Sequence, residues 1–360
     1  MILISTQYFS HFARASWRRK GPDLWSVLPV LPVLAILGLA GCAHTGPATP
    51  PASVVWPPPP DEPRVRFVSA ISQPADFGFK SSGWSKVANW IIGAPVENQK
   101  FRKPFGLGLD ESDNLCLTDT GANVVWFFDL AQSHCQRWEK VGKLRFLSPV
   151  AVAKRGNTIF VADSALGSVI AFDTKGKLLF EIKRELQRPV GLAISNGQLF
   201  VADSQLNAIV VFDLNGRFLR QFGERGGGPG EFNFPTHVTV DAQGSVLVTD
   251  SMNGRIQRLD PQGKYESRIG SPGDSSGHFS RPKGVAMDSQ GHVYVVDGLF
   301  GNIQIFNSEG QLLLALGGVG SKPGEFWLPN GIAISHDNRI FVADSYNRRM
   351  QILKYVGGAQ

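Results

Sequence analysis

Cysteine is scarce in this sequence, since only Cys42, Cys116 and Cys135 occur among 360 residues. Long helical periodicity is also missing from the part of the chain after residue 102, which argues against an array of helical repeats. In contrast, 40 glycines and 23 prolines accompany a hydrophobic fraction of 42% and a charged fraction of 18%. These proportions exclude a disordered chain and are typical of a globular protein with many tight turns.

The first 41 residues have the pattern of a signal peptide. Basic residues precede an apolar run from Leu24 to Ala40, namely Arg14, Arg18, Arg19 and Lys20. The run ends in Leu-Ala-Gly-Cys, which resembles a bacterial lipobox and implies lipidation of Cys42 after cleavage. A plain transmembrane anchor is the alternative, because about 20 apolar residues span a bilayer. Both interpretations place the body outside the cytoplasm, attached to a membrane.

Residues 42 to 63 are rich in proline and predict an extended tether rather than part of a core. Ala43 follows the predicted lipidated cysteine, which slightly favours the outer membrane, with the body facing the periplasm. The formal net charge of +6 includes the basic residues of the signal peptide, so it is weak evidence for nucleic-acid binding. No nucleic-acid partner is expected.

A unit of roughly 45 residues recurs six times from residue 104 onward, a period typical of solenoids and propellers. Each unit opens with a proline: Pro104, Pro149, Pro189, Pro235, Pro282 and Pro329. The third unit reads as four short strands separated by turns, "PVGLAI", "QLFVAD", "IVVFD" and "RFLRQFG". A glycine recurs in the tight turn before the fourth strand, at Gly176, Gly216, Gly263 and Gly310. Four antiparallel strands per unit predict the blades of a β-propeller.

The last unit, "GGVGSKPGEFWLPNGIAISHDNRIFVADSYNRRMQIL", resembles the NHL repeat. The resemblance extends from Arg102 to Val356 and implies an all-β, six-bladed β-propeller over residues 102–360. It also identifies the glycine-rich stretches, such as "GERGGGPGEF", as connections between blades. The first unit departs from the pattern, because "DLAQSHCQRW" lacks the turn glycine.

Residues 64–101 precede the propeller and contain two further predicted elements. The last blade has no fourth strand of its own, and Val65 to Ile71 has the alternation of an outer strand that closes the ring. Residues 84–92 carry apolar side chains at helical spacing and predict a short helix packed on the propeller. A plug over the channel or a membrane-surface helix are the alternatives.

One aspartate stands at the end of the second strand in every unit: Asp119, Asp163, Asp203, Asp250, Asp297 and Asp344. Six equivalent positions on a ring cannot meet at one reaction centre. An aspartate side chain readily accepts a hydrogen bond from the backbone N–H two residues on. These residues therefore predict turns rather than catalysis.

The two residues after each opening proline are expected at the channel mouth. They include a polar group made of Thr236, His237, Lys283 and Asn330. A zinc site needs three or four His, Cys or carboxylate ligands, as in the related amidating lyases, and calcium prefers carboxylates. One histidine without an acidic neighbour predicts neither, so no metal, cofactor or catalytic residue is assigned.

Basic residues precede several opening prolines, at Arg102, Lys103, Arg188 and Arg281, and Trp327 precedes Pro329. Together they predict a basic rim with an aromatic anchor, suited to a protein or an anionic polymer. The favoured function is a lipid-anchored, non-enzymatic binding or scaffold module in the cell envelope. The alternative is a metal-dependent lyase or lactonase-like hydrolase in the central channel.

Cys116 and Cys135 are predicted on the second and fourth strands of one blade. Strands two apart are separated by about 9.6 Å, whereas the Cα atoms of a disulfide lie within about 7 Å. Two separate thiols are expected.

Overall fold

The computed structural model describes residues 54–78, 99–241 and 243–357, all of which belong to a compact unit that begins at Pro51. The predicted signal peptide, the lipidation site Cys42, most of the tether and the helix at 84–92 lie outside the described residues. Within the described ranges, no helix has the length and apolar character needed to cross a membrane.

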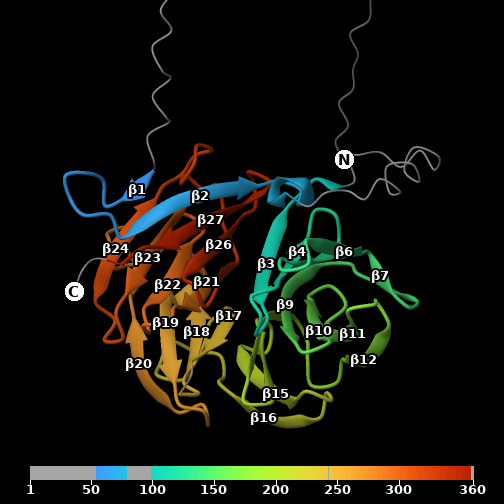
Figure 1. Cartoon of the computed structure of the whole chain (residues 1–360). Helices are drawn as coiled ribbons and strands as arrows, with labels where there is room; N and C mark the ends of the chain where they lie inside the picture. The colour runs from blue at the N-terminus through green and yellow to red at the C-terminus, as the bar shows by residue number, and fades with distance from the viewer. Residues whose placement is uncertain (1–53, 79–98, 242, 358–360) are drawn as a thin grey trace, which may run out of the picture. The chain divides into compact units, whose positions relative to one another are not determined.

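Six antiparallel sheets follow one another around a common axis, as the sequence predicts (Figure 1). Blade 1 contains β3 (Pro104–Leu109), β4 (Leu115–Asp119), β5 (Val124–Asp129) and β6 (His134–Trp138), and blade 2 contains β9 (Pro149–Arg155), β10 (Thr158–Asp163), β11 (Ser168–Asp173) and β12 (Leu178–Ile182). Blade 3 contains β13 (Pro189–Ser195), β14 (Gln198–Asp203), β15 (Ala208–Asp213) and β16 (Phe218–Phe222), and blade 4 contains β17 (Pro235–Val240), β18 (Val246–Asp250), β19 (Arg255–Leu259) and β20 (Tyr265–Ile269). Blade 5 contains β21 (Pro282–Met287), β22 (Val293–Asp297), β23 (Asn302–Phe306) and β24 (Leu312–Gly317).

Blade 6 joins the two ends of the propeller. Its own strands are β25 (Ile332–Ile334), β26 (Arg339–Asp344) and β27 (Arg349–Tyr355), and β2 (Val65–Ile71) pairs antiparallel with β27 (Figure 1). The register places Val65 opposite Tyr355 and Ile71 opposite Met350. The prediction that an N-terminal strand closes the ring is confirmed.

The sheet of blade 6 extends one strand further than the sequence indicated. β1 (Val55–Trp56) pairs with β2, and the Trp56 side chain packs against the core beside Gly324. The C-terminal end of the proline-rich stretch is therefore part of the folded body. Partial burial of the Trp56 indole is the physical reason, because an aromatic ring contributes a large apolar area.

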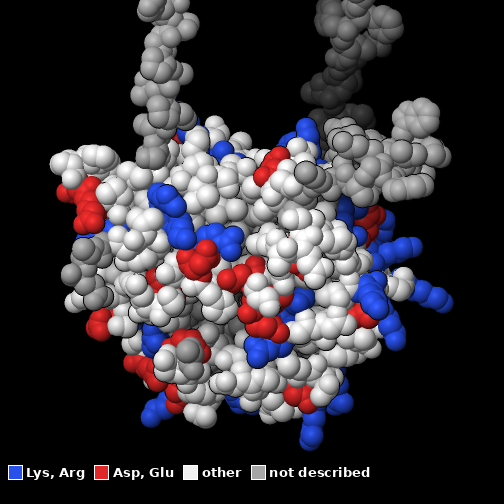
Figure 2. Space-filling model, in the orientation of Figure 1, with Lys and Arg blue, Asp and Glu red and all other residues white. Residues whose placement is uncertain are grey.

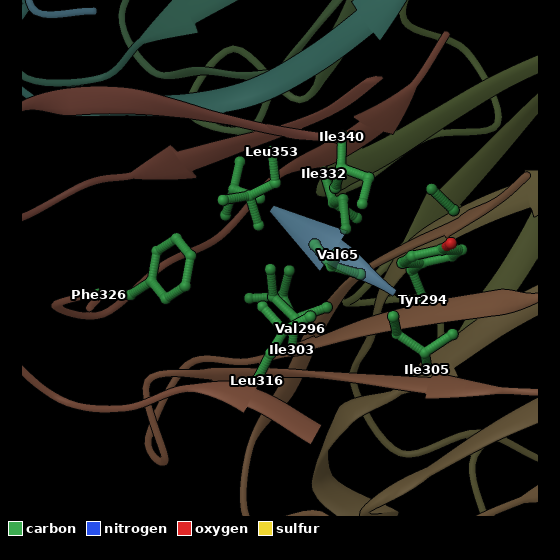
Figure 3. Close-up of a cluster of buried hydrophobic side chains, with 12 residues drawn as sticks. Val65, Tyr294, Val296, Ile303, Ile305, Leu316, Phe326, Ile332, Ile340 and Leu353 are labelled. Carbon is green, nitrogen blue, oxygen red and sulfur yellow. The ribbon is translucent and has the colours of Figure 1, made fainter. Parts of the chain in front are cut away.

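Hydrophobic side chains fill the spaces between neighbouring blades. At the boundary of blades 5 and 6, Val65 of β2 points into a cluster with Leu353, Ile340, Val296 and Ile303 (Figure 3). All five are fully buried. Burying one such side chain stabilises the fold by about 1.5–3 kcal/mol, so the closing strand is held by its core residues as well as by its ladder.

The glycine-rich loops serve as connections between blades. In three of them a buried glutamine amide, from Gln257, Gln304 or Gln351, accepts a backbone N–H of the loop and donates to one of its carbonyls. Blades 1 and 2 are instead joined by a small ribbon, β7 (Lys140–Val141) and β8 (Leu144–Arg145).

The turns before the fourth strands follow the glycine pattern. Gly176, Gly216, Gly263 and Gly310 all have positive φ, from 80° to 92°. Blade 1 lacks this glycine, and Ser133 adopts φ of 51° in its turn. The outer strand of blade 1 nevertheless forms.

Cys116 and Cys135 are free thiols, as predicted. Strand β5 lies between them, because Cys116 is opposite Phe127 and Cys135 is opposite Phe128. Burial raises the pKa of the Cys116 thiol to about 12, so this residue behaves as a small core side chain.

Candidate functional site

The repeated aspartates are completely buried, and each fixes the turn that carries the rim of the propeller. Asp119 accepts the backbone N–H of Gly121 at 2.9 Å, which confirms the predicted turn. It also accepts the N–H groups of Arg102 at 2.6 Å and Lys103 at 2.9 Å. Equivalent contacts surround Asp163, Asp203 and Asp297. A carboxylate with several N–H donors forms charge-assisted hydrogen bonds, which are about twice as strong as neutral ones.

Blades 4 and 6 use a variant of this arrangement that the sequence analysis missed. Asp250 pairs with Arg255 at 2.8 Å, and Asp344 pairs with Arg349 at 2.7 Å. Both carboxylates still accept a rim N–H, from Asn233 and Trp327 respectively. In both blades an arginine stands five residues after the aspartate, and this spacing in the sequence could have indicated the ion pair.

Every predicted rim residue therefore has its backbone N–H bonded to a buried carboxylate. This holds for Arg102, Lys103, Arg188, Arg281 and Trp327. Because these residues occupy the two positions before the opening prolines, their backbone lies on the same face of the ring. The side chains at this face start from a fixed backbone, which lowers the entropy cost of ordering them on binding.

Aromatic and cationic side chains from blades 6 and 1 stack on this rim. The Trp327 and Tyr346 rings are 5.6 Å apart between centroids, and Lys103 Nζ lies 4.9 Å from the Tyr346 centroid. Trp327 is 51% exposed and Tyr346 is 46% exposed. We call these three residues the aromatic anchor. The sequence pattern predicts Trp327 and Lys103 at this place but does not predict Tyr346.

Further exposed apolar side chains lie at equivalent positions of the repeat. Met252 and Leu299, like Tyr346, stand two residues after the blade aspartate, and each is more than half exposed. Arg281 bridges blades 5 and 4, since its Nη1 lies 3.2 Å from Met252 Sδ. These exposed apolar residues could have been predicted from the sequence, because each stands two residues after a repeated aspartate.

The rim near Arg188, in blade 3, lacks such an exposed apolar side chain. The Arg188 guanidinium lies 5.6 Å from the Phe234 ring of the next unit, and its side chain is exposed. In blade 3 the position two residues after the aspartate is Gln205 rather than an apolar residue. This position therefore carries an exposed apolar or aromatic side chain in blades 4, 5 and 6, and a polar one in blade 3.

At the hub, the first strands approach so closely that little space remains for side chains. A Cβ on Gly331 would lie 2.4 Å from Phe105 O, and a Cβ on Gly284 would lie 2.5 Å from Asn330 O. The Gly284 and Gly331 N–H groups donate to these same two oxygens across the blade boundaries. Five of the six equivalent hub positions hold glycine or alanine: Gly106, Ala151, Gly191, Gly284 and Gly331.

His237 occupies the sixth hub position and lines the channel. Its Nδ1 is buried and has no hydrogen-bond partner among the described residues. Burial and, to a smaller extent, the charge of Lys283 lower the pKa of His237 to about 3, so the imidazole is neutral near pH 7. Burial and the neighbouring Arg281 lower the pKa of Lys283, while Asp297 acts in the opposite direction.

Thr236 and Asn330, the other predicted mouth residues, are both 7% exposed. The Asn330 amide donates to Leu328 O and Ser345 Oγ, at 3.1 and 3.0 Å. Ser345 Oγ in turn donates to Pro104 O at 2.6 Å, across the boundary of blades 6 and 1. Asn330 therefore contributes to ring closure, whereas Thr236 Oγ1 is buried without a partner in the described part of the chain.

A cavity of about 250 Å³ is lined by His237 and mainly by aliphatic side chains of the first strands. Its charged lining residues are Glu111, Lys154 and Arg155. In the described ranges, no group of three or more His, Cys, Asp or Glu side chains converges in a way that could hold a metal ion.

One loop has the spacing of a nucleophile elbow, Gly-x-Ser-x-Gly, at Gly273 to Gly277. Ser275 Oγ lies 3.1 Å from His278 Nδ1, and the contact is exposed. The segment is an inter-blade connection, not the strand–turn–helix of an elbow. In the equivalent loop of the preceding unit, the Glu231 carboxylate accepts the Gly228 N–H, so the side-chain contact here is part of the loop geometry.

Two family models match the chain. One, described as a 6-bladed beta-propeller, matches residues 184–269, and the NHL repeat model matches residues 279–306 and 326–353. The chain carries NHL repeats and folds as a six-bladed β-propeller. No curated protein matches the sequence of this propeller.

Several solved structures share the propeller fold. Virginiamycin B lyase from Staphylococcus aureus matches with 14% identity and a TM-score of 0.53, over 71% of this chain and 96% of that chain. The hydrazine synthase of Kuenenia stuttgartiensis matches with 15% identity and a TM-score of 0.53, over 71% and 96%. A structural genomics protein from Bacteroides thetaiotaomicron matches with 13% identity and a TM-score of 0.57, over 71% and 70%. At these identities the likeness concerns the fold alone.

Proposed function

We propose that this propeller is a lipid-anchored binding module that holds an acidic protein partner on its rim face, outside the cytoplasm. The observation that carries the proposal is the aromatic anchor, in which the exposed Trp327 and Tyr346 rings stack beside the turn of buried Asp344. Lys103, whose backbone is held by buried Asp119, lies over the Tyr346 ring. Tryptophan, tyrosine and arginine are the residue types that contribute most to binding free energy in protein interfaces.

The charge of the rim supports an acidic partner. Arg102, Lys103, Arg188 and Arg281 project from the face, whereas the repeated aspartates are buried and bonded to backbone N–H groups. Complementary charge accelerates association and fixes the orientation of a complex. The apolar side chains of Met252 and Leu299 favour a folded protein surface over a purely polyanionic polymer.

The test is a comparison of two aromatic substitutions after crosslinking and identification of bound proteins. Trp327→Ala should weaken binding of the partner by about 2 kcal/mol or more, because it removes the anchor. Phe218→Ala is the matched control, since Phe218 is 44% exposed on the outer strand β16, away from the rim. A partner that binds both variants equally well contradicts the proposed face.

Charge reversal separates the basic rim from the anchor. Arg188→Glu and Arg281→Glu should together reduce the association rate and its dependence on salt. Retention of every partner by this double variant would count against an acidic partner.

Lipid attachment at Cys42 forms part of the proposal, and the lipobox-like sequence supports it. Cys42→Ser should release the body from the membrane fraction. Mass spectrometry of the wild-type N-terminus should find diacylglycerol on Cys42. An uncleaved N-terminus would instead favour the plain transmembrane anchor.

The alternative function, a metal-dependent lyase or hydrolase in the channel, remains a prediction. It has the fold likeness to virginiamycin B lyase in its favour. Metal analysis of the purified protein separates the two functions: stoichiometric zinc or calcium that is lost in His237→Ala would favour the enzyme.

A further inference from the structure

A pocket of about 320 Å³ opens between blades 1 and 2, beside the β7–β8 ribbon. Its charged lining residues are Lys100, Arg102, Arg137, Arg145 and Glu139. Lys and Arg side chains also outnumber Asp and Glu at the edge of the propeller that carries β6 and β7 (Figure 2). The pocket is therefore concave and has an excess of positive charge.

The only carboxylate in the lining is already shared. Glu139 accepts Arg137 Nη1 at 2.7 Å and Arg145 Nη2 at 3.0 Å, and these contacts lower the pKa of Glu139, which keeps it ionised. Lys100 and Arg102 have no carboxylate partner among the described residues. Four cations facing one anion repel one another, and a bound anion would relieve this repulsion.

Two buried N–H donors in the lining also favour a bound anion. The Trp126 side chain is 3% exposed, and its indole Nε1 has no acceptor within the described part of the chain. Arg137 Nε is likewise buried and unpaired, and its guanidinium lies 5.5 Å from the Trp126 ring. An unpaired buried N–H is costly, so such groups usually have an acceptor in the functional state.

The pocket lies where the chain departs from the repeat. It forms because the first unit departs from the repeat and continues into the β7–β8 ribbon, where three other connections are glycine-rich loops. A feature built on such a departure from the repeat is a candidate for a specific site.

We propose that this pocket binds a phosphate monoester of a small organic molecule. A dianionic phosphate balances the uncompensated charge, and its three terminal oxygens match the planar forks of arginine side chains. The volume exceeds that of inorganic phosphate, and Ala122, Phe146 and Leu147 provide an apolar wall for the organic part. The pocket shares Arg102 with the rim, but it takes a small ligand, and its binding can be measured without a protein partner.

The first test is titration of the purified full chain with glycerol 3-phosphate in a calorimeter at constant ionic strength. Arg145→Gln should lower the affinity about tenfold, because it removes one charge-assisted contact. Arg217→Gln is the matched control, because Arg217 is exposed on the outer turn of blade 3, outside the pocket and the rim, and it should leave the affinity unchanged. Equal affinities in all three proteins, or no binding to the wild type, would overturn the proposal.

A second variant guards against a purely structural explanation. Glu139→Gln removes the competing carboxylate and frees Arg137 and Arg145, so it should increase the affinity several-fold. Structural damage to the ribbon would reduce the affinity instead, and that result would contradict the proposal.

The two sources of a phosphate group can be separated with a diester. Dimethyl phosphate carries one negative charge, like the phosphodiester of a lipid headgroup, and should bind about tenfold more weakly than the monoester. Equal binding of the two probes would overturn the assignment to a monoester.

Discussion

The hub and the rim of this propeller are built from neighbouring residues of the same repeat, yet they have opposite properties. Around the hub, glycine and alanine allow the first strands to touch, and His237 is the one large side chain at that level. A few residues earlier in each unit, the rim presents Arg102, Arg281 and Trp327 to solvent from turns bonded to buried aspartates. The repeat therefore fixes the backbone, while side chains at a few positions decide which region packs and which region can bind.

The largest loss of stability is expected when a buried aspartate that holds the rim is replaced. Asp344→Ala leaves Arg349 buried without its partner and removes the acceptor of the Trp327 N–H. The free energy of unfolding should fall by about 3–5 kcal/mol, as measured by urea denaturation.

Asp337→Ala provides the control for this prediction, because the ion pair of Asp337 with Arg339 is partly exposed, with 49% and 34% of the two side chains accessible. Its effect should stay below about 1 kcal/mol. If both variants lose the same stability, the buried aspartates do not have the special role assigned to them.

At the hub, the contact between neighbouring first strands is the target. Gly331→Ala places a Cβ 2.4 Å from Phe105 O, a backbone atom that cannot move away alone. Stability should fall by about 1–3 kcal/mol. Gly227→Ala is the matched control, because no atom lies within 4 Å of the added Cβ. Thermal unfolding of the two variants measures the difference, and equal stabilities would argue against tight contact at the hub.

The buried imidazole of His237 at the hub should make the stability of the fold depend on pH. The folded pKa of about 3 lies below the unfolded value of about 6.5, so the unfolded state binds the proton first as pH falls. His237 therefore contributes stability that is complete above about pH 6.5 and is lost as pH falls toward 3, by up to about 1.4 kcal/mol per pH unit.

The His237→Gln variant isolates this effect, since other carboxyl groups titrate in both proteins. Urea denaturation between pH 7 and pH 5 should show a steeper loss for the wild type than for the variant. The same slope in both would mean that solvent reaches the imidazole.

Much of this architecture follows from local sequence. Opening prolines, turn glycines and the strand-terminal aspartates fix the blades and the turns because each acts within one unit, and the alternation of Val65 to Ile71 identifies the closing strand. Contacts between units were harder to predict. Tyr346 meets Lys103, and Trp56 meets Gly324, only after the ring has closed. Asn330 looked like a polar mouth residue, but its amide is bonded within blade 6.

The central claim is that buried aspartates hold the backbone of an exposed rim. Amide hydrogen exchange tests it most directly in the loop before blade 3, where the Arg188 N–H donates to Asp203 and the Arg184 N–H has no acceptor in the described structure. Both side chains are exposed, so the comparison isolates the backbone. The Arg188 amide should exchange on the order of 100-fold more slowly than the Arg184 amide. Equal exchange at the two positions would contradict the claim.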